Sequence, residues 1–187
     1  MHRPHLPLPL PEIDIRRFSI EANMKFRKAT ENDIDEICGM VKAAIDVMEA
    51  NGIHQWDEIY PTKEEFLDDI RGSNLFVGIK DTKIAVVFVL NKWQDPAYFS
   101  AEWTYKGEQF CVLHRLCVNP KFQNQGVAKE TLYYIEEKLK NAGVRSIRLD
   151  AFTENPYALK LYKNFGYRTT GTADWRKGKF FLMEKNL

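Results

Sequence analysis

The sequence has few cysteines, few histidines and no long apolar run, and each shortage argues against a class of protein. Its 187 residues include three cysteines and four histidines, and neither type shows the paired spacing of a zinc site. An odd number of cysteines without paired spacing favours reduced thiols, and we therefore expect a cytoplasmic protein without a metal. No apolar stretch approaches the ~20 residues that a membrane-spanning helix needs.

An excess of charge of one sign is also missing. The 27 basic and 26 acidic residues are interspersed along the chain, and the formal net charge is +1. Proteins that bind nucleic acids or membrane surfaces usually carry a basic block or stripe, so we expect neither partner. Small molecules or ordinary protein surfaces are the expected partners.

The first 23 residues differ in composition from the rest of the chain. Four of the eight prolines fall within the first eleven residues, where they alternate with leucines. Proline fixes its own φ and lacks a backbone donor, so this stretch is not the apolar core of a signal peptide. We interpret 1–23 as a disordered extension, or one that stems from vector or upstream sequence, and 24–187 as one domain. A proline-rich interaction tail is the alternative.

Hydrophobic periodicity after Met24 predicts alternating strands and helices. Apolar residues from Ile34 to Met48 recur at steps of three and four, which predicts a helix that ends at Asn51 and Gly52. Two β-rich runs on either side of residues 81–82 predict a hairpin. The complete order is β-α-α-β-β-β-α-β-α-β-β, which is typical of a mixed α/β sheet.

The segment 119–130, "NPKFQNQGVAKE", connects a predicted strand, "FCVLHRLCV", to a predicted amphipathic helix. A helix N-terminus has unpaired N–H groups and a partial positive charge, so it binds phosphate oxygens. Gly126 and Ala128 would let a ligand approach the backbone closely, and the amides of 123–125 add neutral donors. We interpret this segment as a cradle for a pyrophosphate. A plain strand–helix turn is the alternative, because short glycine motifs often match by chance.

Two motifs resemble those of the GNAT superfamily of N-acetyltransferases. "QNQGVA" at 123–128 resembles the Q/R-x-x-G-x-G/A pattern, and "NPYALKLYKNFGY" at 155–167 resembles the N-x-x-A-x-x-L-Y-x-x-x-G-F/Y segment. The motifs and the order of elements together cover most of 24–187. The chain departs from the commoner pattern in having Gln123 instead of arginine and Ala128 instead of glycine. The missing arginine removes a charge-assisted contact to the ligand.

The resemblance implies a mixed, mostly antiparallel sheet whose central parallel strands splay apart to hold acetyl-CoA, the acyl donor, between flanking helices. It implies that acetyl-CoA binds to the end of the first of these strands, to the loop and helix start after it, and to the second motif. The implied residues are Leu116, Cys117, Val118, Gln123, Asn124, Gln125, Gly126, Val127, Ala128, Asn155 and Tyr162.

Acetyl transfer needs a base for the amine and an acid for the leaving thiolate. The resemblance implies Tyr162 as the general acid, and a packing aromatic is the alternative. His114 is a candidate base or acceptor ligand, and a structural histidine is the alternative. In an ideal strand Cys117 lies on the opposite face from His114, so we expect direct transfer in a ternary complex and no acyl-cysteine, unless a bulge intervenes.

The acceptor pocket is expected to be built from the aromatic-rich segments 53–60 and 93–109. The predicted pocket residues are Trp56, Tyr60, Trp103 and His114, around an unidentified small-molecule or peptide amine. Four acidic residues are available to attract a cationic amine: Asp57, Glu58, Glu102 and Glu108. Several of the aromatic residues could instead cap the hydrophobic core.

Three other functions stay open from the sequence. The chain could be a catalytically silent module that binds CoA, a protein-interaction domain that does not bind CoA, or an enzyme that transfers the acetyl group to a hydroxyl. The last predicted strand, 178–187, could form a homodimer by analogy with relatives.

Overall fold

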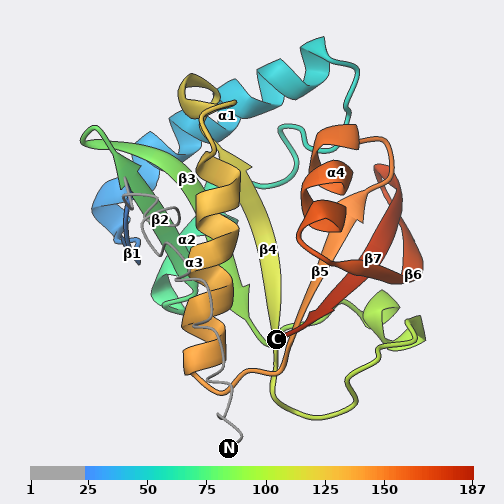
Figure 1. Ribbon diagram of the computed structural model, residues 1–187. Helices are drawn as coiled ribbons and strands as arrows, with labels where there is room; N and C mark the ends of the chain where they lie inside the picture. The colour runs from blue at the N-terminus through green and yellow to red at the C-terminus, as the bar shows by residue number, and fades with distance from the viewer. Residues whose placement is uncertain (1–23) are drawn as a thin grey trace, which may run out of the picture.

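The computed structural model describes residues 24–187, and the predicted extension 1–23 lies outside the described residues. A seven-stranded sheet in the order β1-β2-β3-β4-β5-β7-β6 forms the centre of the molecule (Figure 1). Its strands are β1 (Lys25–Lys28), β2 (Leu75–Lys80), β3 (Lys83–Asn91), β4 (Phe110–Val118), β5 (Ser146–Phe152), β6 (Arg168–Trp175) and β7 (Gly178–Asn186). Only β4 and β5 pair in parallel among these strands. The predicted order of elements and the mostly antiparallel mixed sheet are confirmed.

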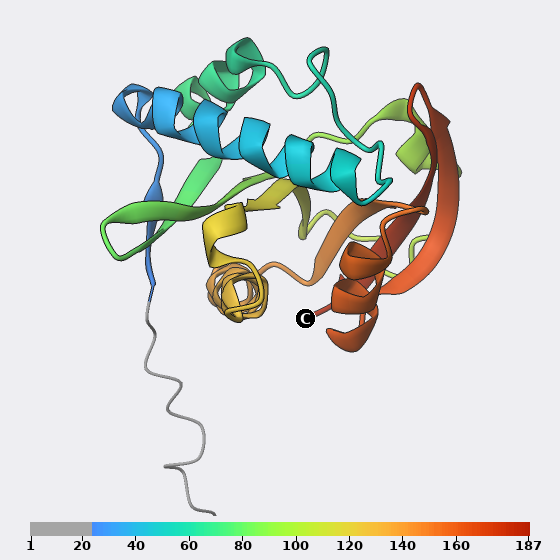
Figure 2. The same ribbon diagram turned by 90° about the horizontal axis from the view of Figure 1, so that it is seen from above.

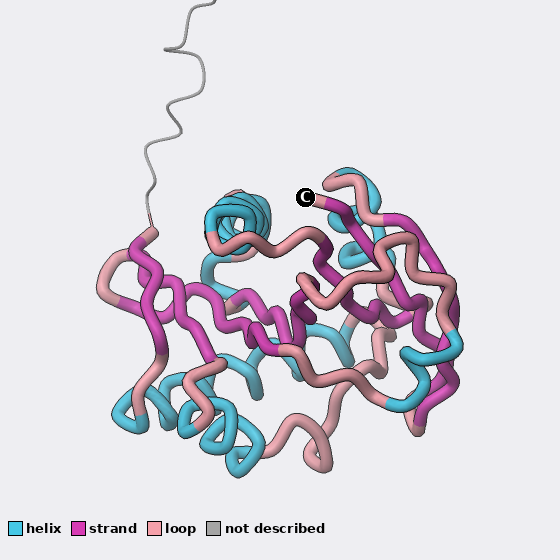
Figure 3. Tube along the Cα trace, turned by 90° about the horizontal axis from the view of Figure 1, so that it is seen from below, coloured by secondary structure: helices cyan, strands magenta, loops and turns pink. Residues whose placement is uncertain are grey.

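Helices cover both faces of the sheet. Figure 2 shows α1 (Ile34–Ala50) and α2 (Lys63–Arg71) on one face, and α3 (Val127–Asn141) and α4 (Pro156–Asn164) on the other. The view from below shows the same layers (Figure 3). Ile37 of α1 packs with Val87 in one apolar core, while Leu132 of α3 packs with Phe88 in the core of the opposite face. No helix in 24–187 is both long and apolar enough to cross a membrane.

Local sequence signals set several boundaries of these elements. Thr62 and Glu65 form a reciprocal capping box at the start of α2, which satisfies two donors of the first turn. The β2–β3 hairpin turns through Asp81 and Thr82, whose φ values are 49° and 63°. Positive φ at both turn residues is the geometry of a type I′ turn, which matches the twist of the strands that it joins.

The central parallel strands separate because β4 contains a bulge. β4 and β5 pair only from Phe110 to Leu113 on the β4 side. Opposite β3, the register shifts between His114 and Cys117, and Arg115 takes a φ of 50°. An extra residue bends a strand and increases its local twist. The ends of β4 and β5 therefore diverge, as Figure 1 shows between the two strands, which confirms the predicted splay.

The last strand, β7, lies between two other strands. It pairs with β5 along one side and with β6 along the other. Its backbone is therefore already used within the sheet, and residues 178–187 have no free strand edge to offer a second chain. The outer strand at this end of the sheet is β6, and Glu102 N of the loop donates to its Thr170 O at 2.9 Å.

Candidate active site

Two cavities meet where β4 and β5 diverge. The first, the cofactor groove, has a volume of about 550 Å³ and lies between α1, the end of β4 and the starts of α3 and α4. The second, the acceptor cavity, has a volume of about 380 Å³ and lies beneath the loops 51–62 and 92–109 and the β6–β7 turn. Both cavities are lined by Gln55, Trp56, Leu116, Asp150 and Tyr162. A group that passes between the cavities must pass these residues.

The start of α3 presents the backbone N–H groups of its first turn at the cofactor groove. Gly126 is the N-cap residue with a φ of 80°, and a Cβ placed on it would meet no atom within 4 Å. Glu130 N donates to Gly126 O at 3.0 Å, so the N–H groups of the turn before it lack a helical acceptor. Such a turn, with its partial positive charge, binds phosphate oxygens.

The structure brings most of the predicted acetyl-CoA residues together around this groove. Gln125 is the exception, because its side chain accepts from Lys80 Nζ and donates to Lys121 O, both at 3.0 Å. The predicted residues that line the groove are Leu116, Cys117, Val118, Gln123, Asn124, Gly126, Val127, Ala128, Asn155 and Tyr162.

Asn155 connects the groove to the residues shared with the acceptor cavity. Its Oδ1 accepts from Ala158 N at 3.1 Å and so caps α4, and Pro156 occupies the first turn as predicted. Its Nδ2 donates to Gln55 Oε1 at 2.9 Å. The cap therefore fixes the side chain at the mouth of the groove.

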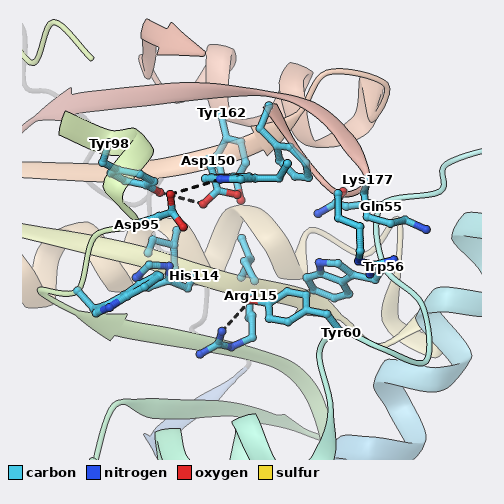
Figure 4. Close-up of a pocket in the computed structure, with 16 residues that line it drawn as sticks. Gln55, Trp56, Tyr60, Asp95, Tyr98, His114, Arg115, Asp150, Tyr162 and Lys177 are labelled. Atoms are coloured by element: carbon cyan, nitrogen blue, oxygen red, sulfur yellow. Dashed lines mark hydrogen bonds between the residues drawn. The ribbon is translucent and has the colours of Figure 1, made fainter. Parts of the chain in front are cut away.

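A carboxylate and a phenol, those of Asp150 and Tyr162, lie at the junction of the cavities. Asp150 of β5 accepts a hydrogen bond of 2.8 Å from the Tyr98 hydroxyl (Figure 4). Burial raises the pKa of Asp150 to about 6, so its carboxylate is ionised but basic at neutral pH. Burial and the charge of Asp150 raise the pKa of Tyr162 well above its usual value, so its phenol keeps its proton.

Sequence reasoning missed Asp150. The available signal was the single carboxylate in "RSIRLDAF", the predicted strand that precedes the second motif. Its neighbour Tyr98 lies more than fifty residues away in a loop, so no spacing in the sequence connects the two side chains.

His114 lies in the acceptor cavity as a neutral imidazole. Its Nε2 is 3.0 Å from Asn91 Oδ1, and the same oxygen accepts from Trp93 N at 2.9 Å. The oxygen is thus an acceptor towards both groups, which places the imidazole proton on Nε2. Burial and the charge of Arg115 lower the pKa of His114 to about 4, which makes it a weak base.

The bulge corrects the predicted faces of β4. Cys117 is opposite Val87 and His114 is opposite Val89, and both valines belong to the core under α1. His114 and Cys117 therefore share a face, and the prediction from an ideal alternation was wrong because the extra residue shifts the pleat. Burial raises the pKa of the Cys117 thiol to about 12, so it is not a nucleophile at neutral pH.

The predicted wall residues Trp56 and Tyr60 line the acceptor cavity. Tyr60 accepts a hydrogen bond of 2.7 Å from Arg115 Nη1, and Arg115 also forms a buried ion pair with Asp69 of α2. These contacts tie the loop before α2 to the bulge in β4. Trp93 stands at the mouth of the cavity with 62% of its surface exposed.

Trp103 lines neither cavity, so its predicted place in the acceptor wall was wrong. It is 7% exposed, and its Nε1 donates to Tyr98 O at 2.8 Å. Its ring centre lies 4.6 Å from the guanidinium carbon of Arg148, a cation–π contact. A buried indole needs a partner for its N–H and a buried guanidinium needs a π face, so the two stack behind the loop and hold Tyr98 in position.

The predicted acidic residues also lie outside the acceptor lining: Asp57, Glu58, Glu102 and Glu108. The carboxylates that line this cavity are Asp95 and Asp150. Asp57 is instead bound by Arg176 at 2.8 and 2.9 Å and by Lys177 at 3.2 Å. The hydrogen bonds from Arg176 hold the pKa of Asp57 far below its usual value, so this carboxylate is committed to structure and does not attract an amine.

Comparisons with known proteins agree with this arrangement. The family model described as "Acetyltransferase (GNAT) family" matches residues 44–167, more than half of the chain. The N-acetyltransferase YesJ of Bacillus subtilis (strain 168) is 27% identical over 168 residues, which is 85% of this chain and 88% of YesJ.

Solved structures show the same fold. A GNAT-family acetyltransferase from Streptococcus agalactiae 2603 superposes with a TM-score of 0.79 at 24% identity, over 88% of this chain and 95% of its own. The PaiA N-acetyltransferase of Thermoplasma acidophilum, solved in complex with coenzyme A, superposes with a TM-score of 0.66 at 18% identity. The superposition covers 88% of this chain and 99% of the PaiA chain. Because the family model spans both the splayed strands and the two motifs that line the groove, the chain belongs to the Acetyltransferase (GNAT) family and is an acetyltransferase.

Proposed function

We propose that the protein is an acetyl-CoA-dependent N-acetyltransferase that transfers the acetyl group directly to an amine in a ternary complex. The observation that carries this proposal is the position of Asp150 and Tyr162, a base and an acid, where the cofactor groove meets the acceptor cavity. Each of the two substrates would reach the same two side chains from its own side.

The residues of the cofactor groove fit acetyl-CoA. The open space over Gly126 and the first turn of α3 suit a pyrophosphate, and the unpaired side of β4 at 116–118 suits the amides of a pantetheine arm. Asn155 would bind the arm from the side of α4. The similar fold of the PaiA enzyme, which was solved with coenzyme A, supports this assignment. Acetyl-CoA supplies the thioester.

The reaction forms one bond and breaks one. The amine nitrogen bonds to the acetyl carbon, the carbon–sulfur bond breaks, and the products are an amide and the CoA thiol. Asp150 takes the proton that the amine loses, directly or through a water, and Tyr162 donates a proton to the sulfur. Each side chain then returns to its starting state by proton exchange with solvent.

Asp150 is a better base for this step than His114. A carboxylate with a pKa of about 6 is ionised at neutral pH, whereas the pKa of His114 is lowered to about 4. The catalytic role of His114 stays a prediction, and its place in the acceptor lining suits a substrate contact better. The thiol of Cys117 is too weak an acid to form an acyl-enzyme, which favours direct transfer.

A calorimetric titration of the full chain with acetyl-CoA, and in parallel with CoA, tests the proposal first. We expect micromolar binding of both, followed by release of free thiol when amines are added. No binding by the folded protein would leave a protein-interaction domain. Binding without thiol release to any amine or hydroxyl acceptor would indicate a silent regulatory module. A cytoplasmic location and a homodimer stay predictions.

A further inference from the structure

We infer that the acceptor is a small amino-acid-like molecule, in which the reacting amine is accompanied by a carboxylate that binds Lys177 and by an apolar or aromatic body. This inference rests on the proposed function, because it names the substrate class of the same site. The observation behind it is Lys177, a cation in the lining of the acceptor cavity that shares its carboxylate partner, Asp57, with Arg176.

In the Asp57 cluster one carboxylate accepts hydrogen bonds from two cationic side chains. Its Oδ1 accepts from Arg176 at 2.9 Å and from the backbone N–H groups of Ile59 and Tyr60 at 3.0 and 3.3 Å. Its Oδ2 accepts from Arg176 at 2.8 Å and from Lys177 at 3.2 Å. Asp57 is thus shared between two cations; the charge of Glu58 acts on Arg176, so Lys177 has only this shared partner in the cluster.

Lys177 is the member of this cluster that remains available to a ligand. Both terminal nitrogens of Arg176 are bound to Asp57, whereas the ammonium of Lys177 uses one of its three donors there. Lys177 lines the acceptor cavity, and its side chain is only 21% exposed. A partly desolvated ammonium gains more from an anionic ligand than one in open water.

The position of Lys177 separates the two charged ends of the acceptor. In Figure 4, Lys177 lies on the side of the cavity near Gln55 and Trp56, apart from Asp150, which lies near Tyr98 and Tyr162. Trp175 and Phe180 also line the cavity and supply further aromatic surface. An amine placed at Asp150 can thus extend an apolar body along these rings and present a carboxylate to Lys177. A second cationic group at that end would be repelled.

Thiol-release kinetics with matched acceptors test this inference on the full chain. The probes are L-phenylalanine with L-phenylalaninamide and L-leucine with L-leucinamide, which differ only in whether the terminal group is anionic. The measured quantity is the ratio of kcat/KM between the acid and the amide. We expect Lys177→Gln to lower that ratio about 10- to 100-fold, the effect of losing one charge-assisted hydrogen bond. The amines of the acid and the amide differ in basicity, but this difference affects the wild type and Lys177→Gln equally and cancels when their ratios are compared.

Lys179→Gln is the matched control. Lys179 lies two residues further along the chain, pairs with Asp174 on the surface and does not line either cavity. Its replacement removes the same charge from the protein and should leave the acid-to-amide ratio unchanged. Acetyl-CoA titrations of both variants should match the wild type, which separates an acceptor effect from a folding defect.

The outcomes distinguish the inference from the function beneath it. A lower acid-to-amide ratio of kcat/KM in Lys177→Gln, with no change of the ratio in Lys179→Gln, supports the inference. An unchanged ratio in that variant overturns it, while turnover of the amides would still establish acetyl transfer. Acetyl-CoA binding without turnover of either acid also overturns the inference, since the cofactor groove is then intact. Absence of acetyl-CoA binding to the folded wild type overturns the proposed function itself.

Discussion

The cofactor groove and the acceptor cavity are built from different parts of the chain. The groove combines one continuous stretch, the end of β4 and the first turn of α3, with residues of α1, the loop 51–62, β5 and the start of α4. The acceptor cavity presents side chains from the loops 51–62 and 92–109, from β5 and from the β6–β7 turn, which are distant in sequence. Backbone donors are positioned by local conformation, whereas these side chains are positioned by contacts between elements.

Buried polar contacts hold the loops of the acceptor cavity against the sheet. Arg115 ties the loop 51–62 to α2, and Arg148 donates to Tyr105 O at 2.8 Å and lies 4.0 Å from Glu184. The carboxylate of Glu184 also accepts from Thr104 N at 2.6 Å. A desolvated charge is costly unless it is paired, so each pair holds its loop to the sheet. The acceptor cavity therefore depends on distant anchors, whereas the turn at the start of α3 depends on local backbone conformation.

Replacing Tyr162, which belongs to both cavities, should give the largest effect. Tyr162→Phe should lower kcat about 10²- to 10⁴-fold because the leaving sulfur loses its proton donor. Thiol-release kinetics measure this, and the Kd for acetyl-CoA by calorimetry should change little. Tyr167→Phe is the control, since its buried ring lies 5.6 Å from that of Tyr162 but lines neither cavity. Full turnover by Tyr162→Phe would remove Tyr162 from the mechanism.

Asp150→Asn should lower kcat/KM about 10²- to 10³-fold by removing the base. In the wild type, kcat/KM should rise as the pH passes through about 6, because the pKa of Asp150 is raised to that value and the carboxylate is the active form. A pH profile of kcat/KM measures both effects. The variant should lack this rise, and the same profile in both proteins would exclude Asp150 as the base.

The same substitution should increase the free energy of unfolding at high pH. The pKa of Asp150 is about 6 in the folded protein and lies near ~3.9 in an unfolded chain. Between these values the unfolded state loses a proton that the folded state keeps, so stability falls as the pH rises through this window. The increase in the free energy of unfolding that Asp150→Asn causes should therefore be about 1–3 kcal/mol larger at pH 8 than at pH 4. Thermal denaturation of the wild type and the variant at both pH values measures this difference. An equal increase in stability at pH 4 and pH 8 would contradict the raised pKa of Asp150.

A smaller effect is expected at the start of α3. Gly126→Ala should raise the Kd for acetyl-CoA about 10-fold or more, because a methyl group would project into the open space where the backbone meets the pyrophosphate. Gly143→Ala is a close control, since Gly143 ends the same helix with a φ of 79° against 80° for Gly126 and an equally open Cβ position. Both should lose about 1–2 kcal/mol of stability. Equal Kd values of the two variants for acetyl-CoA would show that acetyl-CoA does not bind next to Gly126.

The smallest effect is expected at the mouth of the acceptor cavity. Trp93→Ala should raise the KM of aromatic acceptors several-fold, since the exposed indole supplies a stacking surface there. The Kd for acetyl-CoA and the melting temperature should stay close to the wild-type values. A change in the acceptor KM alone for Trp93→Ala, and in the acetyl-CoA Kd alone for Gly126→Ala, would show that the two cavities bind different substrates. A changed acetyl-CoA Kd in Trp93→Ala would contradict this separation.

The residues predicted to bind acetyl-CoA lie together in the structure, whereas those predicted to form the acceptor wall do not all do so. The glycine at 126, the amides before it and the amphipathic helix after it form one local pattern, and the structure brings nearly all the predicted residues together in one groove. On the acceptor side Trp56 and Tyr60 line the cavity, whereas Trp103 packs against Arg148. An aromatic residue in a loop can face a ligand or the core, and only its partners decide which.

The order of strands and helices, the capping of helices, the hairpin turn and the glycine turn at the start of α3 could be read from the sequence alone, because each follows from conformational preferences within a few residues. The bulge at Arg115, the pairing of Tyr98 with Asp150 and the place of Lys177 in the acceptor cavity could not. Each of these depends on a partner far away in the sequence, and a change of pKa or of strand face arises only when folding brings that partner into contact and excludes water.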